Sequence, residues 1–227
     1  MTFIAMARGE TNASKRTGDA RGDGSASGSN GSGGADAARR RTRDPNAKRA
    51  ALHEAAMRCF SARGFEAVSI ADIAREARIA VGTVYRFYPN KIALLRAMHD
   101  ALETEFVACI ERAWAGELPH AERLDAVCTA LFELMDARRA ELRVLSMTTD
   151  IAHEDGRLPG DRVRERIAFN IADAQSAGAF RTGNPAMLAA MAHGTVEGAM
   201  HHWLRTGMDR DTIARETATT LRNGVVR

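Results

Sequence analysis

The chain has 227 residues, with 32 Lys or Arg against 29 Asp or Glu, so its formal net charge is only +3. No apolar run approaches the length of a membrane span, and residues 1–10 are too short and too interrupted for a secretory signal, so we expect a cytoplasmic protein without a membrane segment. Aromatic residues make up 5% of the chain and alanine-rich helical patterns dominate, which favours an all-α fold over a sheet.

Residues 1–44 differ in composition from the rest of the chain. Positions 22–34 hold six glycines and four serines, too little apolar surface to offset the entropy of ordering the chain, so we expect a disordered tail. The tail ends in a basic run, in which Arg41 and Arg43 are candidate minor-groove contacts if the following segment binds DNA. A solvated tail, or a start codon assigned upstream of the true one, explains the same residues equally well.

Three short helices are predicted between residues 45 and 91. The first ends near Gly64, and the second is capped by Ser69, with Asp72 three residues later completing a capping-box variant. The third begins near Val81 and is stopped by Pro89. The second and third helices, joined by a tight turn, form a helix-turn-helix, which indicates DNA binding.

The third helix carries small or polar side chains on its outward face. Short side chains let a helix backbone approach the major groove, where hydroxyls and cations meet phosphates and base edges. We therefore expect Thr83, Tyr85 and Lys91 to contact phosphates, Val81, Gly82 and Arg86 to face base edges, and Ser69 and Ala80 to lie at the helix starts beside the DNA.

Residues 47–95 resemble the TetR (tetracycline-repressor) family of bacterial transcriptional regulators. The resemblance implies a three-helix DNA-binding head followed by about six helices that bind a small-molecule effector and form a homodimer. It also implies a repressor that binds a near-palindromic operator and is released by the effector. The matching residues are Ala55, Ala56, Phe60, Gly64, Phe65, Ile73, Ala74, Ala77, Gly82, Thr83, Tyr85, Pro89, Lys91, Leu94 and Leu95.

The chain departs from the family pattern at three positions. Arg78 stands where the family usually has the turn glycine, and a positive φ there costs a non-glycine residue about 1 kcal/mol. Arg78 is also a candidate phosphate contact. Ala80 leaves the start of the third helix without a side-chain acceptor. Tyr88 replaces a common core phenylalanine and leaves a hydroxyl group to be placed.

The remaining sequence predicts long helices. Their expected ranges are 91–114, 119–135, 137–149, 161–177, 185–204 and 209–223, with a loop over 153–160. We expect a DNA-binding domain over 45–91 and a ligand-binding and dimerisation domain over 92–227. Residues 45–98 hold nine Lys or Arg and four acidic residues, whereas residues 99–227 hold fifteen and twenty. A basic head on an acidic body suits a protein that presents one end to a polyanion.

Two features mark the helix expected over residues 185–204. Ala190, Gly194 and Gly198 recur every four residues and make a stripe that another helix can approach closely, so Gly194, Gly198 and His201 are candidate dimer contacts. Packing within one subunit is the alternative. His193 and Glu197 precede His201 at i, i+4, i+8 spacing, which could supply metal ligands but needs a partner from elsewhere to close a site. Polar groups at the dimer contact or lining the effector pocket fit better, and we predict no metal and no cofactor.

The resemblance also implies an effector pocket among the middle helices. Adaptable apolar side chains there favour a hydrophobic ligand, although Phe and Met at helical spacing are more often ordinary core. The candidate lining residues are Phe106, Phe132, Met135, Phe169, Met191 and Trp203.

Other functions remain open at this point. Cys59, Cys109 and Cys128 lie in apolar stripes and are expected to be reduced core thiols, with redox sensing the alternative. The same fold also serves transcriptional activators and DNA-binding proteins that take no ligand. A metal-dependent enzyme built on the histidine-rich helix is the remote alternative, since the sequence shows no nucleophile–base pair or closed ligand set.

Overall fold

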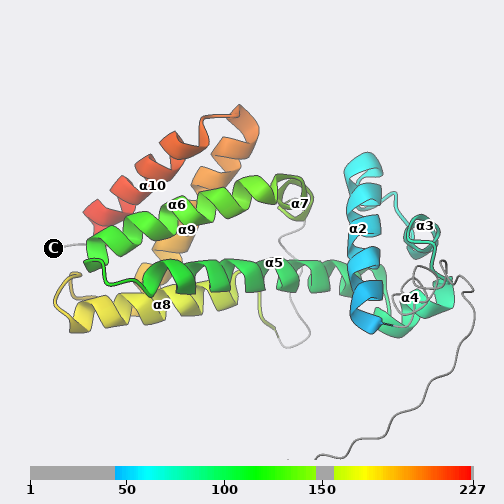
Figure 1. Ribbon diagram of the computed structural model, residues 1–227, viewed down its shortest axis with the longest axis horizontal. Coiled ribbons are helices and arrows are strands. Elements are labelled where there is room, and N and C mark those ends of the chain that lie inside the picture. Colours follow the sequence, from blue (N-terminus) through cyan, green and yellow to red (C-terminus); the bar gives the residue numbers. More distant parts are fainter. Residues whose placement is uncertain (1–43, 147–155, 226–227) are drawn as a thin grey trace, which may run out of the picture. The chain divides into compact units, whose positions relative to one another are not determined.

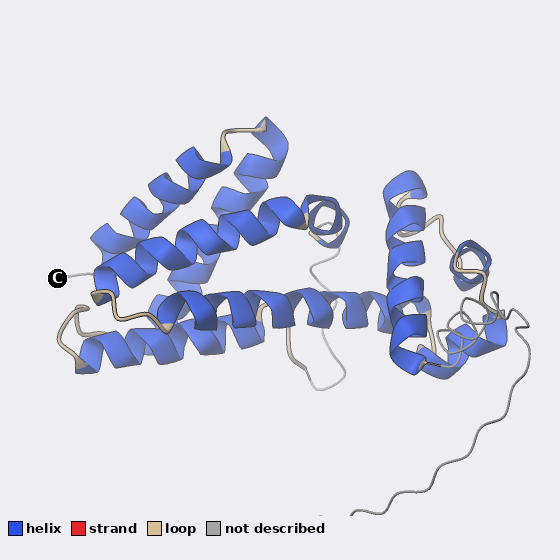
Figure 2. Cartoon of the chain, viewed as in Figure 1, coloured by secondary structure: helices blue, strands red, loops and turns tan. Residues whose placement is uncertain are grey.

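The computed structural model describes residues 44–146 and 156–225, and within these ranges it contains helices and loops but no strand (Figure 2). The all-α prediction is therefore confirmed. The described helices are α2 (Pro45–Arg63), α3 (Ile70–Glu76), α4 (Val81–Phe87), α5 (Lys91–Trp114), α6 (His120–Ala137), α7 (Arg139–Leu145), α8 (Asp161–Ser176), α9 (Pro185–Thr206) and α10 (Arg210–Val225).

The first three of these helices form the head. Asp44 caps α2 by accepting a hydrogen bond from the Asn46 amide at 2.9 Å, and Gly64 ends the helix with a φ of +78°. Helix α2 packs against α3, and α3 packs against α4. Apolar residues at helical spacing bury one face of α2, so the head owes its cohesion mainly to apolar burial. The buried residues of α2 are Leu52, Ala55, Ala56, Cys59 and Phe60.

The hydroxyl group of Tyr88 finds its partner inside the head. Tyr88 is buried after the end of α4, and its Oη lies 2.9 Å from Nε2 of His53 on α2. The two rings are tilted, with centroids 5.8 Å apart. A buried hydroxyl without a partner would destabilise the head, so the pairing explains how this chain accommodates a tyrosine there.

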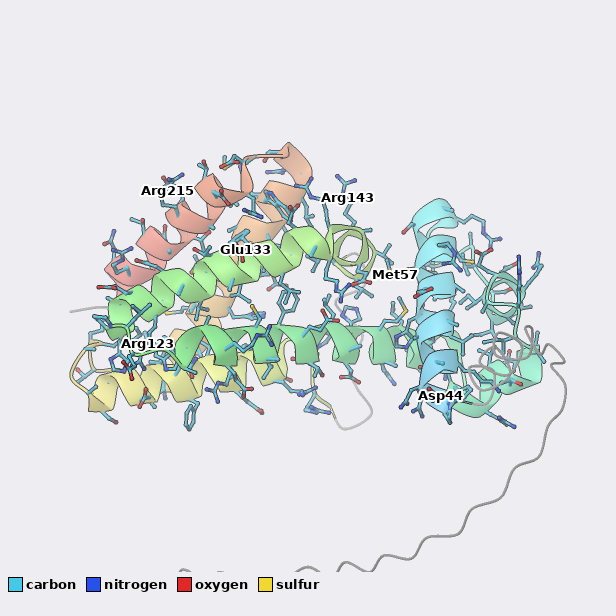
Figure 3. All side chains as sticks on the ribbon, in the orientation of Figure 1. Asp44, Met57, Arg123, Glu133, Arg143 and Arg215 are labelled. Carbon is cyan, nitrogen blue, oxygen red and sulfur yellow. The ribbon has the colours of Figure 1, made fainter. Side chains whose placement is uncertain are left out.

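The other described helices pack around α5 (Figure 1). Helices α6 and α8 lie along α5, α9 packs on α8, and α10 packs on α6 and α9. Short α7 follows α6 and contacts α2. Met57 lies on the side of α2 that is nearest α7 (Figure 3). One hydrophobic cluster contains buried residues of α2–α4 together with residues of α5–α10. The domain boundary expected at residue 91 thus falls inside a continuous apolar core, and it remains a prediction.

Local capping signals set the starts of the long helices as expected. Asn90 accepts from the Ala93 amide at 2.8 Å at the start of α5. Asn184 accepts from the amides of Ala186 and Met187 ahead of α9, whose first residue is Pro185. Helix α7 ends at Leu145, before the expected end at residue 149, and residues 147–155, with part of the expected loop, lie outside the described residues. No described helix has both the length and the apolar character to cross a membrane.

His53 makes the stability of the head sensitive to pH. Burial, and secondarily the positive charge of Arg49, lower the pKa of His53 below its usual value of 6.5. Burial likewise lowers the pKa of His193. The unfolded chain then binds more protons than the folded chain below about pH 6.5, so the free energy of unfolding falls as the pH falls.

We predict that His53→Gln flattens this loss between about pH 7.5 and 5.5, because glutamine can still bond to Tyr88 but does not titrate. Urea denaturation across that range measures the effect. His193→Gln is the matched variant and should remove its own, separate share of the slope. Identical pH profiles for wild type and His53→Gln would contradict the assignment.

Candidate DNA-binding face and ligand cavity

The helix-turn-helix is held by a capping box at the start of α3. The amide of Asp72 donates to Oγ of Ser69 at 3.1 Å, and the Ser69 amide donates to Oδ2 of Asp72 at 3.0 Å. Arg63 and Arg75 also contact the Asp72 carboxylate. Hydrogen bonds from Ser69, followed by these cations, hold the pKa of Asp72 well below its usual range. The Ser69 hydroxyl, a candidate DNA contact, also donates to Asp72 and so serves the fold of the head.

Helix α4 turns one side to the core and the other to solvent. Val84 is fully buried, whereas Val81 is 41% and Tyr85 is 53% exposed. Gly82 and Arg86 are exposed beside them, and Thr83 is half-buried. Outside its own helix, a Cβ atom at Gly82 would meet no atom of the described residues within 4 Å, so the glycine leaves a low point on this side of α4. The exposed side of α4 thus combines two large side chains, Val81 and Tyr85, with a glycine and a cation.

The cations around this face divide into paired and unpaired groups. Arg58 pairs with Glu76 at 2.7 Å, and Arg63 pairs with Asp72 at 3.4 Å. Among the described residues, no ion pair involves Arg78 or Arg86. These two guanidinium groups are exposed and available to an anion such as a DNA phosphate.

Arg78 adopts the left-handed conformation expected at the turn, with a φ of +56°. It is the one described non-glycine residue with a positive φ. The Ile79 amide, directly after it, donates to the Ala74 carbonyl at 2.9 Å, which closes the turn after α3. The structure also leaves Ala80 without a side-chain cap at the start of α4, as expected from its methyl group.

Lys91 is engaged within the head. Its Nζ donates to the Phe65 carbonyl at 2.6 Å and to the Glu66 carbonyl at 3.3 Å, and it lies 4.2 Å from the centroid of the Phe65 ring. The sequence predicts that Lys91 contacts a phosphate, and this contact remains a prediction. In the described structure this lysine joins the start of α5 to the loop between α2 and α3. Arg41 and Arg43 lie outside the described residues.

A cavity of about 180 Å³ lies among α5, α6, α7, α8 and α9. We call it the outer cavity. Most of its lining is apolar, including Phe106 and Met135, and polar groups gather around His193. The lining residues are His99, Leu102, Glu103, Phe106, Leu131, Met135, Leu142, Leu145, Ser146, Pro159, Gly160, Val163, Arg164, Ile167, His193, Val196, Glu197 and Met200.

Hydrogen bonds and ion pairs within the protein engage several polar groups of the outer cavity. Oε1 of buried Glu103 accepts from the backbone amides of Arg162 and Val163 at 2.9 and 3.4 Å, at the start of α8. Arg164 contacts Asp161, and His193 lies 3.8 Å from Glu197. Because burial lowers the pKa of His193, its ring is neutral at pH 7 and can both donate and accept hydrogen bonds.

Four of the six expected lining residues lie elsewhere. Phe132 and Trp203 pack edge-to-face in the core, with ring centroids 6.3 Å apart, and neither lines the outer cavity. Phe169 is 63% exposed and Met191 is 61% exposed, and neither lines the cavity. Helical periodicity identified apolar residues but could not show which neighbour each one contacts. A pocket role was one of the alternatives for His193 and Glu197, and both line the outer cavity.

An apolar stripe of α9 faces solvent in the single chain. It contains Met187, Met191, Gly194, Gly198 and His201, all exposed. Among residues 44–146 and 156–225, a Cβ atom at either glycine would meet nothing within 4 Å. The described part of the subunit therefore offers the two glycines no packing partner. We call this surface the α9 stripe.

The remaining histidines and cysteines were candidates for a metal or redox site. No group of three His, Cys, Asp or Glu residues in the described parts of the chain could hold a metal ion. His201 lies on the exposed stripe, apart from the cavity that His193 lines. The three cysteines are buried and free, and burial raises the pKa of Cys128 to about 12, as expected of inert core thiols.

A short helix buried on one side, set by a tight turn behind a capped helix, defines a helix-turn-helix protein. Residues 52–98 match the family model described as bacterial regulatory proteins, tetR family. The match covers the helix-turn-helix and the first part of α5, and over these residues the chain is similar to tetR-family regulatory proteins. Proteins of that family are regulators, so the match gives the enzyme alternative no support.

The chain is also similar to individual regulators. It is 30% identical over 115 residues to the HTH-type transcriptional repressor KstR of Mycolicibacterium smegmatis, covering 50% of this chain and 55% of KstR. It thus spans about half the length of that curated relative. The fold resembles the fatty acid degradation regulator FadR from Bacillus halodurans, with a TM-score of 0.69 and 18% identity over 80% of this chain and 97% of FadR. It also resembles SmeT, the repressor of the Stenotrophomonas maltophilia multidrug efflux pump SmeDEF, with a TM-score of 0.66 and 22% identity over 82% and 93%.

Two substitutions at Arg78 separate its conformational cost from its charge. We predict that Arg78→Gly raises the free energy of unfolding by up to about 1 kcal/mol, because glycine adopts a positive φ without steric cost. Arg78→Ala keeps that cost and should leave stability nearly unchanged. Chemical denaturation measures both variants.

If Arg78 contacts a phosphate, both variants lower the salt dependence of duplex binding by about one counterion. Equal stability of Arg78→Gly and Arg78→Ala would contradict the account of strain. An unchanged salt slope in both would remove Arg78 from the DNA contacts.

Proposed function

We propose that this protein is a ligand-responsive transcriptional repressor, with α4 as the helix that enters the major groove of its operator. The observation that carries the proposal is the exposed face of α4. Val81, Tyr85 and Arg86 are exposed there around Gly82, beside which the described residues leave open space. Arg86 has the reach and the donor geometry to pair with a guanine edge, and Thr83 and Tyr85 offer hydroxyls to phosphates. In this role the protein would act in the cytoplasm, where the operator lies.

The α9 stripe supports a homodimer. Dimers are typical of the family, and the two glycines of the stripe let a second helix approach closely. A twofold dimer carries two copies of α4, which then read half-sites about 34 Å apart in a near-palindromic operator. The head over residues 45–91 would bind DNA, and residues 92–227 would bind the ligand and form the dimer.

The outer cavity supports release by a small apolar effector. Its walls are mostly apolar, and α5 contributes Phe106 and Glu103 to it while also supplying Lys91 to the head. A structural relative has been determined with triclosan, and another, FadR from Bacillus subtilis, with stearoyl-CoA. Hydrophobic ligands of this kind fit the character of the cavity. A ligand that binds one conformation more tightly shifts the population toward it and changes the affinity for DNA.

The DNA-binding role is tested with a fluorescent duplex from the region upstream of the protein's own gene and a scrambled duplex of equal length. We predict that Arg86→Ala reduces the preference for the upstream duplex by about 1–3 kcal/mol, the value of one good base contact. Lys91→Ala should weaken binding to both duplexes, reduce the salt slope by about one, and lower the melting temperature because the Phe65 and Glu66 carbonyls lose their donor.

Anisotropy titrations between about 50 and 200 mM salt give the preference for the upstream duplex and the salt slope. Binding profiles identical to wild type in both variants would refute the assigned roles. The position of the bound segment relative to the promoter then distinguishes repression from activation.

The dimer is tested at Gly194, where a side chain has open space in the single chain. We predict that Gly194→Glu folds with wild-type helicity but sediments as a monomer and binds the upstream duplex more weakly. Thr129→Glu, which places the same side chain on an exposed part of α6, is the control and should remain dimeric. Analytical ultracentrifugation measures the state of each variant, and a dimeric Gly194→Glu would exclude the α9 stripe as the interface.

A further inference from the structure

A second, smaller cavity of about 50 Å³ lies beside the outer one. We call it the inner cavity. Its lining comes from α5, α6, α8, α9 and α10 together with Phe180, and nearly all of it is apolar. Leu131, Ile167 and Val196 line both cavities, so the same three side chains stand between them. A ligand that extends from the outer cavity into the inner one has to displace these side chains.

Asn170 on α8 brings a polar group into this apolar lining. The residue is 4% exposed, and its Oδ1 has no hydrogen-bond partner among the described residues. Buried amide oxygens are almost always hydrogen-bonded in native proteins, because burial removes their hydrogen bonds to water and an unpaired oxygen is destabilising. An unpaired acceptor in the lining of a cavity therefore requires an explanation.

Neighbouring polar groups do not supply the missing donor. Nε1 of Trp114 also lines the inner cavity, but it donates to Oδ2 of Asp173 at 3.4 Å. Cys128 keeps its proton, since burial raises its pKa to about 12, but a thiol is a weak donor. One water molecule would fit the volume, yet an ordered water needs two to four polar partners, more than this lining offers.

We propose that Asn170 selects an effector whose apolar body carries a hydrogen-bond donor, a hydroxyl or N–H group, on the end that enters the inner cavity. The donor pairs with Oδ1 of Asn170, and the apolar lining surrounds the chain that leads to it. This assignment deepens the proposed function and rests on the protein being ligand-responsive. The outer end of the same effector lies near Glu103 and Glu197. Arg164 also lines the outer cavity, but it is paired with Asp161, so the carboxylate of Glu197 makes an ammonium group the better match there.

Two probes test the assignment directly: octylamine and 8-amino-1-octanol. Their ammonium group remains near the outer carboxylates, so the opposite end, either methyl or hydroxymethyl, enters the inner cavity. Calorimetry on the full-length protein without DNA gives the affinity for each probe. The decisive quantity is the ratio of the two dissociation constants, because it cancels effects common to both probes.

We predict that Asn170→Leu and Asn170→Ala each shift this ratio about tenfold against 8-amino-1-octanol, equivalent to about 1.4 kcal/mol. Leucine keeps the volume of the side chain and alanine does not, so agreement between them assigns the shift to the lost acceptor. Ile110→Val removes one methylene group from the same lining without touching a hydrogen bond and should weaken both probes equally. The free Asn170→Leu protein should melt no lower than wild type, because it loses an unpaired polar group.

A ratio that stays the same in both Asn170 variants overturns the proposal, as does failure of the wild type to bind either probe. A lower melting temperature of free Asn170→Leu also overturns it, since that result would show a structural partner for the amide. The proposed function is read separately, from salt-dependent duplex binding, which the Asn170 variants should retain. A wild type that binds no duplex fails as a repressor but still reports the ratio of probe affinities.

Discussion

The burial of one side of α4 is the constraint on which the DNA-binding face depends. A seven-residue helix makes too few internal hydrogen bonds to be stable alone, and this one lacks a side-chain cap at its start. Its position comes from Val84 in the core of the head and from Tyr88, which is bonded to His53 just beyond its end. These two anchors hold the helix from the core, and its opposite side is left exposed to solvent.

Helix α5 connects the head with both cavities. Lys91 in its first turn bonds to the loop after α2, Glu103 lines the outer cavity, and Trp114 at its end lines the inner one. Glu103 also accepts from two amides at the start of α8, so α5 and α8 are tied together at the wall of the outer cavity. A ligand that changes the contacts of α5 or α8 therefore acts on the helix that begins in the head. Such coupling needs only that the ligand bind the two conformations with different affinity.

The features predicted correctly from the sequence are those set by residues close together in the chain. Ser69 and Asp72 form their capping box within three residues, Asn90 and Asn184 cap their helices over a similar span, and Arg78 adopts the left-handed turn that its position demands. These interactions are local hydrogen bonds or backbone preferences, and neighbouring residues decide them.

Features that depend on distant packing were not predicted. Lys91 bonds to a carbonyl 26 residues away, and the walls of the outer cavity come from five helices, so neither can be found from spacing along the chain. Asn170 could have been found. It lies three residues after Ile167 and one before Ile171, within the apolar face expected for that helix, and a lone amide in such a face indicates either a structural hydrogen bond or a binding group.

The position of this amide bears on how selective the regulator can be. An apolar pocket distinguishes ligands that differ by one methylene group only about 10–200-fold, whereas a site built around a buried polar group rejects molecules that leave that group unpaired far more strongly. Nearly all the lining of the inner cavity is apolar and gives affinity with little discrimination. The oxygen of Asn170 is the feature of that lining that can tell a hydrocarbon chain from one ending in a donor. Ile167 and Asn170 lie one turn apart on α8. A ligand that displaces Ile167 and pairs its donor with Asn170 would therefore act on one helix. Glu103 ties that helix to α5.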